Sequence, residues 1–225
     1  MNCTLNNPNK KQLSEIHLIR HGITEGNQKN WFYGAIDIPL ADEGVKELTR
    51  LAEEKIHPCI DIASDEKLAP DFYTSGMLRT EQTFSIIYGD VAHKVIPDLR
   101  EINFGIFEGY NHKELLGRPD YQAWLDMKGL DAAPPEGDNI RDFNDRVQRG
   151  FDTLCGYHRL KELSHRHSKL PCHSVVVCHG GVIAAILTTH FTSPDKKNFY
   201  DWIPDPGHGY SLTMEEGKPI AFRSF

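Results

Sequence analysis

The chain has 225 residues, of which 39% are hydrophobic, and a formal net charge of −7. This length suffices for one large α/β domain or two small ones, and the acidic balance argues against nucleic acid or an anionic membrane as a partner. The polar N-terminus lacks the apolar segment of a signal peptide, and no stretch approaches the ~20 apolar residues that span a bilayer. The five cysteines are scattered, which fits a reducing compartment, so a cytoplasmic protein is expected.

The first predicted strand, residues 15–20, follows a polar tail at residues 1–13. The strand is largely apolar until it ends in Arg20 and His21, and Gly22 comes next. This order is typical of a strand that brings side chains to a ligand pocket at the C-terminal edge of a sheet, where glycine lets the backbone turn and approach the ligand. Two polar residues follow at spacings that return them to the same pocket, Thr24 and Asn27.

The next elements are predicted from hydrophobic periodicity. In chain order they are a helix (42–56), a segment to which we assign no chemistry (57–69), a strand (72–73), a helix (77–88) and a short strand (95–96). Arg79 falls in the first turn of the second helix, at the same sheet edge as His21. On its own, such an arginine is more often a solvated surface residue.

Residues 98–138 are irregular, with several glycines and prolines, and short helices are expected near 112–117 and 119–127. We expect about residues 105–138 to form a small cap-like insertion over the pocket, where it would supply selectivity. Asn139 is then a plausible N-cap for a helix that continues to about residue 160.

A second strand followed by histidine and glycine occurs near the C-terminus. The apolar run 175–177 leads to His179 and Gly180, and the apolar residues 182–187 predict a buried helix. The first turn of that helix would supply free backbone N–H groups beside His179. Two parallel neighbouring strands would place His21 and His179 in one crevice. An edge hairpin is expected beyond it, at residues 210–214 and 219–222.

Arg20-His21-Gly22 with Thr24 and Asn27 resembles the signature of the histidine phosphatase superfamily, in the branch that includes the cofactor-dependent phosphoglycerate mutases. Four further segments match the family's motifs in order: residues 33–40, residues 73–80, residues 99–109 and His179–Gly181. The resemblance covers nearly the whole chain and implies one histidine phosphatase domain over residues 1–225. It also implies a three-layer α/β/α fold with a mostly parallel central sheet and a small helical insertion over the active site.

Phosphoryl transfer requires positioning and positive charge around three equatorial oxygens. His21 is the natural nucleophile, because a neutral imidazole nitrogen can attack phosphorus and form a phosphohistidine. Nearby cations should lower the pKa of His21 and keep it unprotonated at neutral pH. With the resemblance, the expected phosphate-binding residues are Arg20, Asn27, Arg79, His179 and Gly180, and the expected catalytic residues are His21, Glu101, His179, Arg20 and Arg79.

The leaving alkoxide needs a proton, and the sequence offers two carboxylic acids for this step, Glu101 and Glu108. Chemistry alone does not choose between them. The resemblance favours Glu101, which stands in the family's Leu-x-Glu position, and leaves Glu108 as a structural hydrogen-bonding residue before Gly109.

A zinc site is a weaker interpretation of a histidine-rich stretch before the last buried strand. Its members are His165, His167, Cys172 and His173, which we interpret as solvated loop residues. We expect no metal and no cofactor in the reaction, because arginine and histidine already supply the positive charge.

The resemblance implies a phosphomonoesterase that acts on a small phosphorylated metabolite, and a small-molecule phosphate ester is the expected partner. The alternative is a 2,3-bisphosphoglycerate-dependent phosphoglycerate mutase; a non-catalytic phospholigand-binding protein would not need Glu101. The mutases carry a longer insertion with an adjacent pair of arginines, whereas residues 110–138 contain one arginine, Arg118. Hydrolysis is therefore favoured. Whether the chain forms a homodimer stays open, as does the identity of the substrate.

Overall fold

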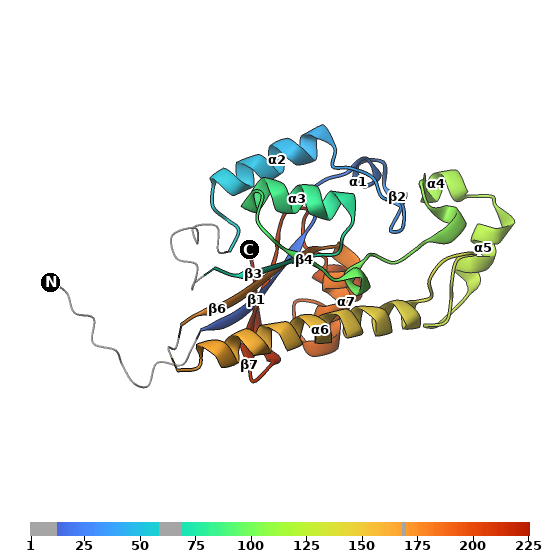
Figure 1. Ribbon diagram of the computed structural model, residues 1–225. Helices are drawn as coiled ribbons and strands as arrows, with labels where there is room; N and C mark the ends of the chain where they lie inside the picture. Colours follow the sequence, from blue (N-terminus) through green and yellow to red (C-terminus); the bar gives the residue numbers. More distant parts are fainter. Residues whose placement is uncertain (1–12, 59–68, 168–169) are drawn as a thin grey trace.

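The computed structural model describes residues 13–58, 69–167 and 170–225. A six-stranded sheet lies at the centre, in the strand order β4-β3-β6-β1-β7-β8 (Figure 1). Its strands are β1 (Ser14–Arg20), β3 (Asp71–Thr74), β4 (Lys94–Val95), β6 (Cys172–Cys178), β7 (Gly209–Glu215) and β8 (Lys218–Ser224). The first four named run parallel, and β7 and β8 run antiparallel. The expected mostly parallel sheet is confirmed.

Helices cover both faces of the sheet (Figure 1). One face carries α2 (Asp42–Glu53) and α3 (Leu78–Tyr88), and the other carries α6 (Ile140–His165) and α7 (Gly180–His190). The buried side chains alternate accordingly: Leu18 of β1 packs in the core shared with α6 and α7, whereas Ile19 packs in the core shared with α2 and α3. This period of two is what a strand buried on both faces requires, and it establishes the three layers.

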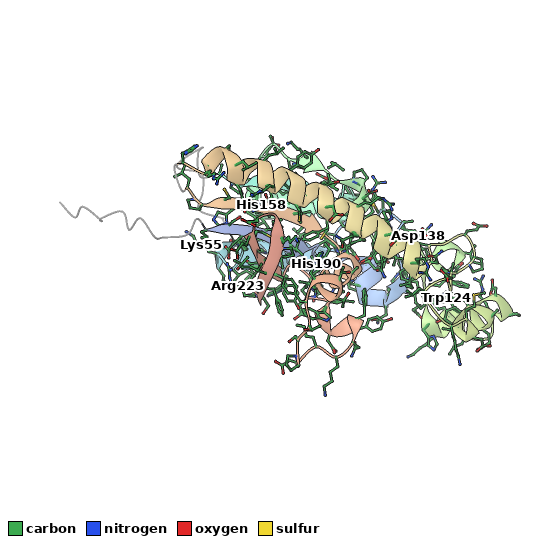
Figure 2. All side chains as sticks on the ribbon, turned by 90° about the horizontal axis from the view of Figure 1, so that it is seen from below. Lys55, Trp124, Asp138, His158, His190 and Arg223 are labelled. Carbon is green, nitrogen blue, oxygen red and sulfur yellow. The ribbon has the colours of Figure 1, made fainter. Side chains whose placement is uncertain are left out.

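Five further elements lie beyond the C-terminal edge of the parallel strands (Figure 1). They are α1 (Glu25–Lys29), β2 (Trp31–Phe32), β5 (Tyr110–Asn111), α4 (His112–Leu115) and α5 (Pro119–Asp126). Three 3₁₀ helices lie at Pro97–Leu99, Gly105–Phe107 and Phe199–Trp202; the first packs against α6 and the last against α7. Phe107, Leu115 and Tyr121 form a small core of their own. Figure 2 shows Trp124 of α5 at the opposite end of the molecule from His158 of α6.

Several predicted boundaries hold and some shift. Asn139 caps α6 by accepting the Asp142 N–H, as expected, but the helix continues to His165 because its buried face extends to His158 and Glu162. Residues 1–12 and most of the segment 57–69 lie outside the described residues. Within the described part of the chain, no helix combines the length and apolar character needed to cross a membrane.

The interpretation of Cys172 and His173 as solvated loop residues is wrong. Both belong to β6, where Cys172 is fully buried and His173 pairs with Glu15 in the register with β1. Polar residues are accommodated there because they contact other polar side chains of the same sheet. His165 ends α6, with its Nδ1 atom 3.5 Å from the Cys172 sulfur, and His167 lies in the turn after it.

Candidate active site

His21 lies directly after β1, where its backbone N–H donates to the carbonyl of Cys178 on β6. The side chain is buried, and its Nδ1 lies 2.7 Å from the Gly22 carbonyl oxygen. A carbonyl can only accept, so Nδ1 carries the hydrogen, and the neutral ring keeps its lone pair on Nε2. Burial, with the positive charges of Arg79 and Arg20, holds the pKa of His21 well below its ordinary value of 6.5. Nε2 is therefore an unprotonated nucleophile at neutral pH.

Arg79 is fully buried in the first turn of α3. Its Nη1 and Nη2 atoms donate to the carbonyls of Ile36 and Gly34, each at 2.9 Å, and its guanidinium lies over the ring of Tyr33 at 5.2 Å. Its Nε atom has no hydrogen-bond partner among the described residues. A buried, unpaired charged donor costs free energy, and an anion beside this atom would remove that cost.

Arg20, the last residue of β1, donates from Nη1 to the Pro204 carbonyl at 2.8 Å. Its Nε atom is also buried and without a partner in the described parts of the chain. Burial lowers the pKa of both Arg20 and Arg79, yet a guanidinium stays charged at neutral pH. Two permanent cations thus lie at this edge of the sheet.

His179 follows β6 and occupies the N-cap of α7. Its ring centroid lies 5.3 Å from that of His21, so the structure brings the two predicted histidines together. Its Nε2 lies 2.8 Å from the Ser75 hydroxyl, which also bonds the Thr80 hydroxyl at 3.1 Å. The Thr80 hydroxyl donates its hydrogen to the Met77 carbonyl. Ser75 must then donate to Thr80 and accept from His179 Nε2–H, which leaves Nδ1 without a hydrogen in the neutral ring.

Two further features follow from this arrangement of His179. Burial, with Arg79 as the next cause, holds its pKa well below 6.5. Its Nδ1 is buried and unpartnered among residues the structure describes. An anion in the pocket would raise the proton affinity of Nδ1 and convert it into a donor.

Glu101 lies in the loop between the 3₁₀ helices Pro97–Leu99 and Gly105–Phe107. Its Oε2 accepts the Gly181 N–H at 2.9 Å, and its Oε1 accepts the Ile102 N–H at 3.0 Å. A side chain at position 181 would place a Cβ 2.4 Å from Oε1, so glycine is required for this contact. Glu101 therefore lies against the first turn of the helix that His179 caps.

Gly180, the first residue of α7, lies next to Arg20: a Cβ there would be 3.1 Å from its Nε atom. Asn27 lies in α1, the short helix that begins four residues after His21. Its Oδ1 accepts from the Thr24 N–H at 3.0 Å and the Thr24 hydroxyl at 3.1 Å. This bonding fixes the amide and leaves Nδ2 as the group that can donate to a phosphate.

Glu108 has the structural role expected for it. Its carboxylate accepts the backbone N–H groups of Gly34, Ala35, Ile36 and Phe104 at 2.6–3.0 Å. Two of these residues, Gly34 and Ile36, present the carbonyls that hold Arg79. Glu108 therefore shapes the loop that positions the arginine.

Sequence reasoning did not assign three residues that complete the site. Ser75 and Tyr33 lie within segments that carry the family resemblance, and their positions in those segments were the available signal. Arg146 of α6 donates to the Arg100 carbonyl at 2.8 Å and the Glu101 carbonyl at 3.2 Å, and so holds the loop that carries Glu101. Nothing in the helical pattern around Arg146 distinguishes it from a surface arginine.

The fold and this pocket define an α/β protein with a cationic, histidine-containing site at the C-terminal edge of its sheet. The profile of the histidine phosphatase superfamily (branch 1) matches residues 16–223. The chain therefore belongs to this superfamily and is a histidine phosphatase enzyme.

Individual relatives span two activities. The chain is 25% identical over 181 residues to an adenosylcobalamin/alpha-ribazole phosphatase of Salmonella typhimurium, which covers 80% of each chain. It is 29% identical over 184 residues to a 2,3-bisphosphoglycerate-dependent phosphoglycerate mutase of Xanthobacter autotrophicus, covering 76% of this chain and 78% of the mutase. The alpha-ribazole phosphatase structure from Shigella flexneri superimposes with a TM-score of 0.65 at 22% identity, covering 91% and 92% of the two chains, and supports the fold.

Proposed function

We propose that the chain is a phosphomonoesterase that hydrolyses a small phosphorylated metabolite through a phosphohistidine on His21. The observation that carries the proposal is the buried, neutral His21 with its lone pair on Nε2. The Nε atoms of Arg20 and Arg79 add buried, unpartnered donors in the described part of the molecule. A nucleophile among charged donors is what a phosphoryl group requires.

In the first step, Nε2 of His21 attacks phosphorus while the bond to the leaving oxygen breaks, and Glu101 gives that oxygen its proton. In the second step, the Glu101 carboxylate takes a proton from water, the water oxygen attacks phosphorus, and the P–N bond breaks. Phosphate leaves, and His21 and protonated Glu101 are restored. The N–H groups of Gly181 and Ile102 hold the Glu101 carboxyl in place for both proton transfers.

Arg20, Arg79, Asn27, His179 and the N–H of Gly180 bind the phosphoryl oxygens in this proposal. The arginines supply permanent charge. His179 becomes a donor when the phosphoryl group raises its pKa and a proton is taken up at Nδ1, because Nε2–H is already directed to Ser75.

Hydrolysis is favoured over the mutase reaction because Arg118 already has a partner within the protein. This arginine, the single one in residues 110–138, donates to both oxygens of Asp120 at 3.1 and 2.7 Å and lies over the ring of Phe107 at 5.4 Å. An arginine already paired in this way is a poor candidate for gripping a substrate carboxylate. The insertion therefore offers no unpaired arginine as a bidentate anchor for a carboxylate; its other cations are two lysines, Lys113 and Lys128.

The test measures turnover of p-nitrophenyl phosphate by the wild type, His21→Ala and a control, His93→Ala, whose histidine instead pairs with Glu81 at 2.7 Å. We expect activity in the wild type and the control, a phosphorylated intermediate that survives an alkaline quench, as the P–N bond of a phosphohistidine does, and neither in His21→Ala. Interconversion of 3- and 2-phosphoglycerate faster than phosphate release would establish the mutase instead. A panel of phosphate esters that includes alpha-ribazole phosphate, sugar phosphates and nucleotides would then identify the substrate class.

A further inference from the structure

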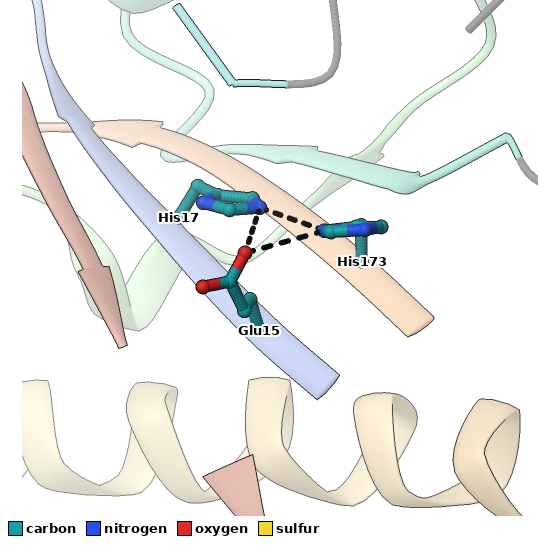
Figure 3. A group of neighbouring side chains, drawn as sticks. All are labelled: Glu15, His17 and His173. Atoms are coloured by element: carbon teal, nitrogen blue, oxygen red, sulfur yellow. Dashed lines mark hydrogen bonds and ion pairs between the residues drawn. The ribbon is translucent and has the colours of Figure 1, made fainter. Parts of the chain in front are cut away.

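A second group of chemically active side chains lies at the other end of the central strands. Glu15 and His17 of β1 face His173 of β6 (Figure 3). The register pairs Glu15 with His173 and His17 with Ser211 of β7, so these side chains form one polar row across neighbouring strands. Glu15 and His17 are buried, and the side chain of His173 is 15% exposed.

Three atoms of this row converge. His17 Nε2 lies 3.0 Å from His173 Nδ1, and Glu15 Oε2 lies 4.0 Å from the former and 3.9 Å from the latter. A triangle with these three sides has a circumradius of about 2.1 Å, so one point is equally near all three atoms. That radius equals the usual length of a zinc bond to imidazole nitrogen or carboxylate oxygen. Within the described residues, no other three potential ligand atoms of histidine, cysteine, aspartate or glutamate come this close together.

We propose that Glu15, His17 and His173 form a binding site for a divalent transition-metal ion of the zinc type. Two imidazoles and one carboxylate are ligands that suit Zn²⁺, and a water molecule would complete a tetrahedron. A tetrahedral site requires each pair of ligand atoms to stand about 3.3 Å apart. The two imidazole nitrogens therefore need to separate by about 0.3 Å, and Glu15 Oε2 needs to approach both nitrogens by about 0.6–0.7 Å.

The surroundings of the imidazoles favour a metal ion. His17 Nδ1 lies 2.9 Å from the Ser211 hydroxyl, and a hydrogen on Nδ1 that is donated to this oxygen leaves the lone pair on Nε2, toward the site. While the site is empty, His173 Nδ1 then donates its hydrogen to His17 Nε2. Binding of the ion requires that this hydrogen shift to His173 Nε2, so that both lone pairs face the ion.

Arg223 of β8 is a positive charge next to the proposed site and would repel a metal ion unless the carboxylate of Glu15 lies between them. Its guanidinium forms an ion pair with Glu15 Oε1, and its Nη2 lies 3.2 Å from Oε2. The carboxylate therefore bridges the arginine on one side and the two imidazoles on the other, and the metal would use the lone pairs of Oε2 that point to the histidines. This arrangement gives the anion two cationic partners.

The expected role is to fasten β1 to β6 rather than to take part in phosphate chemistry. His21 stands four residues beyond His17, ~13 Å along an extended strand. Occupancy should consequently change stability and leave the rate of p-nitrophenyl phosphate hydrolysis unaltered.

The test titrates Zn²⁺ into chelator-stripped protein by calorimetry, in competition with a chelator of known affinity. We expect one equivalent to bind the wild type, and we expect His173→Gln to bind at least tenfold more weakly. The matched control is His93→Gln, because His93 forms a histidine–carboxylate pair with Glu81 but has no third potential ligand close by in the described part of the chain. It should bind as the wild type does. Equal binding by the wild type and a folded His173→Gln would overturn the proposal, as would no binding by the wild type.

Ser211→Ala provides a test that does not depend on His173→Gln folding. It keeps all three ligands and removes the hydroxyl bonded to His17, so the affinity for Zn²⁺ should fall about 10–100-fold. A Zn²⁺-dependent rise in the melting temperature should shrink in parallel. An unchanged affinity in Ser211→Ala would show that any ion binds elsewhere on the chain, since the ring orientation would then not matter.

Discussion

The two ends of β1 and β6 both carry buried histidines, but the two ends differ in how fully their polar atoms are hydrogen-bonded. At the C-terminal edge, buried polar atoms of Arg20, Arg79 and His179 have no partner among the described residues. At the N-terminal end, both nitrogens of His17 are hydrogen-bonded. An unpaired buried polar group costs ~1–3 kcal/mol. A ligand at the C-terminal edge would restore those bonds, whereas the polar row is already bonded within the protein.

The charges at the two ends of these strands also differ. Arg79 and Arg20 both lower the pKa of His21 at the C-terminal edge, and the Glu101 carboxylate, held by the N–H groups of Gly181 and Ile102, lies near both arginines. At the N-terminal end, Glu15 is paired with Arg223. A net positive pocket attracts a phosphoryl group, and a paired carboxylate between two neutral imidazoles suits a metal cation.

The largest expected effect concerns the acid at the C-terminal edge. Glu101→Gln should lose ~10²–10⁴-fold in rate on an alkyl phosphate and much less on p-nitrophenyl phosphate, because p-nitrophenolate leaves without protonation. The measurement is kcat for both substrates in the wild type and the variant, expressed as the ratio of the two losses.

Glu108→Gln is the matched control, since its carboxylate bonds only to backbone N–H groups in the described structure. It should lower both activities about equally, through the position of Arg79 and through stability. If Glu108→Gln shows the dependence on the leaving group and Glu101→Gln does not, the two roles are reversed.

The next effect tests the cations. Arg79→Ala should reduce kcat by ~10²–10³-fold, because removing one donor that stabilises the charge of the transition state typically lowers kcat by this factor. Arg118→Ala, which removes an arginine paired with Asp120 in the insertion, should leave kcat within a few-fold. A rise in KM with unchanged kcat in Arg79→Ala would mean that this arginine holds substrate and transition state equally.

The C-terminal edge was easier to predict from sequence than the N-terminal end, for a physical reason. His21 and His179 each follow an apolar strand and precede glycine, and parallel strands with this pattern bring their ends together whatever the intervening chain does. Glu15 and His173 interrupt the apolar pattern, and their burial depends on a partner 158 residues away in the register of β1 with β6. Periodicity within one segment cannot show such pairing.

Long-range contacts limited the prediction of the site in the same way. Arg20 and Arg79 could be placed at the pocket from strand and helix ends together with the family resemblance. Ser75 meets His179 across 104 residues, and Arg146 reaches the Glu101 carbonyl across 45. Such pairs exist only once the sheet and α6 are assembled, so the orienting residues were missed while the residues they orient were found.

A third prediction tests whether the unpartnered His179 Nδ1 takes up a proton with the ligand. Sulfate, which stays fully ionised, should bind more weakly as pH rises, by up to tenfold per pH unit. The window lies between the pKa of ligand-free His179, well below 6.5, and its higher pKa in the complex. Competitive inhibition by sulfate between pH 5 and 8 measures it. His179→Gln should abolish the slope; a slope that persists there would assign the proton to another group.

The smallest expected effect concerns the N-terminal end of β1 and β6, where the polar side chains bond to one another. His158 of α6 bonds to Ser14 of β1 at 2.7 Å and to Ser174 of β6 at 2.9 Å, on the face opposite His17. Burial lowers the pKa of His158 to about 4 and that of His17 to about 3, against 6.5 in the unfolded chain. The unfolded state therefore binds more protons between these values, so the stability contribution is complete above pH 6.5 and is lost as pH falls through the folded-state pKa. Each histidine contributes a slope of at most ~1.4 kcal/mol per pH unit.

The measurement is the free energy of unfolding in urea at pH 7.5 and pH 5.0, with EDTA present so that no metal ion contributes. The wild type should lose ~1–2 kcal/mol for His158 over this interval. His158→Gln keeps a polar group that can bond to Ser14 and Ser174 but cannot be protonated, so it should show a smaller loss, while His93→Gln should behave as the wild type. An equal loss in His158→Gln and the wild type would mean that a proton on His158 does not destabilise the fold, and that other buried histidines, such as His17, His21 and His179, account for the acid destabilisation.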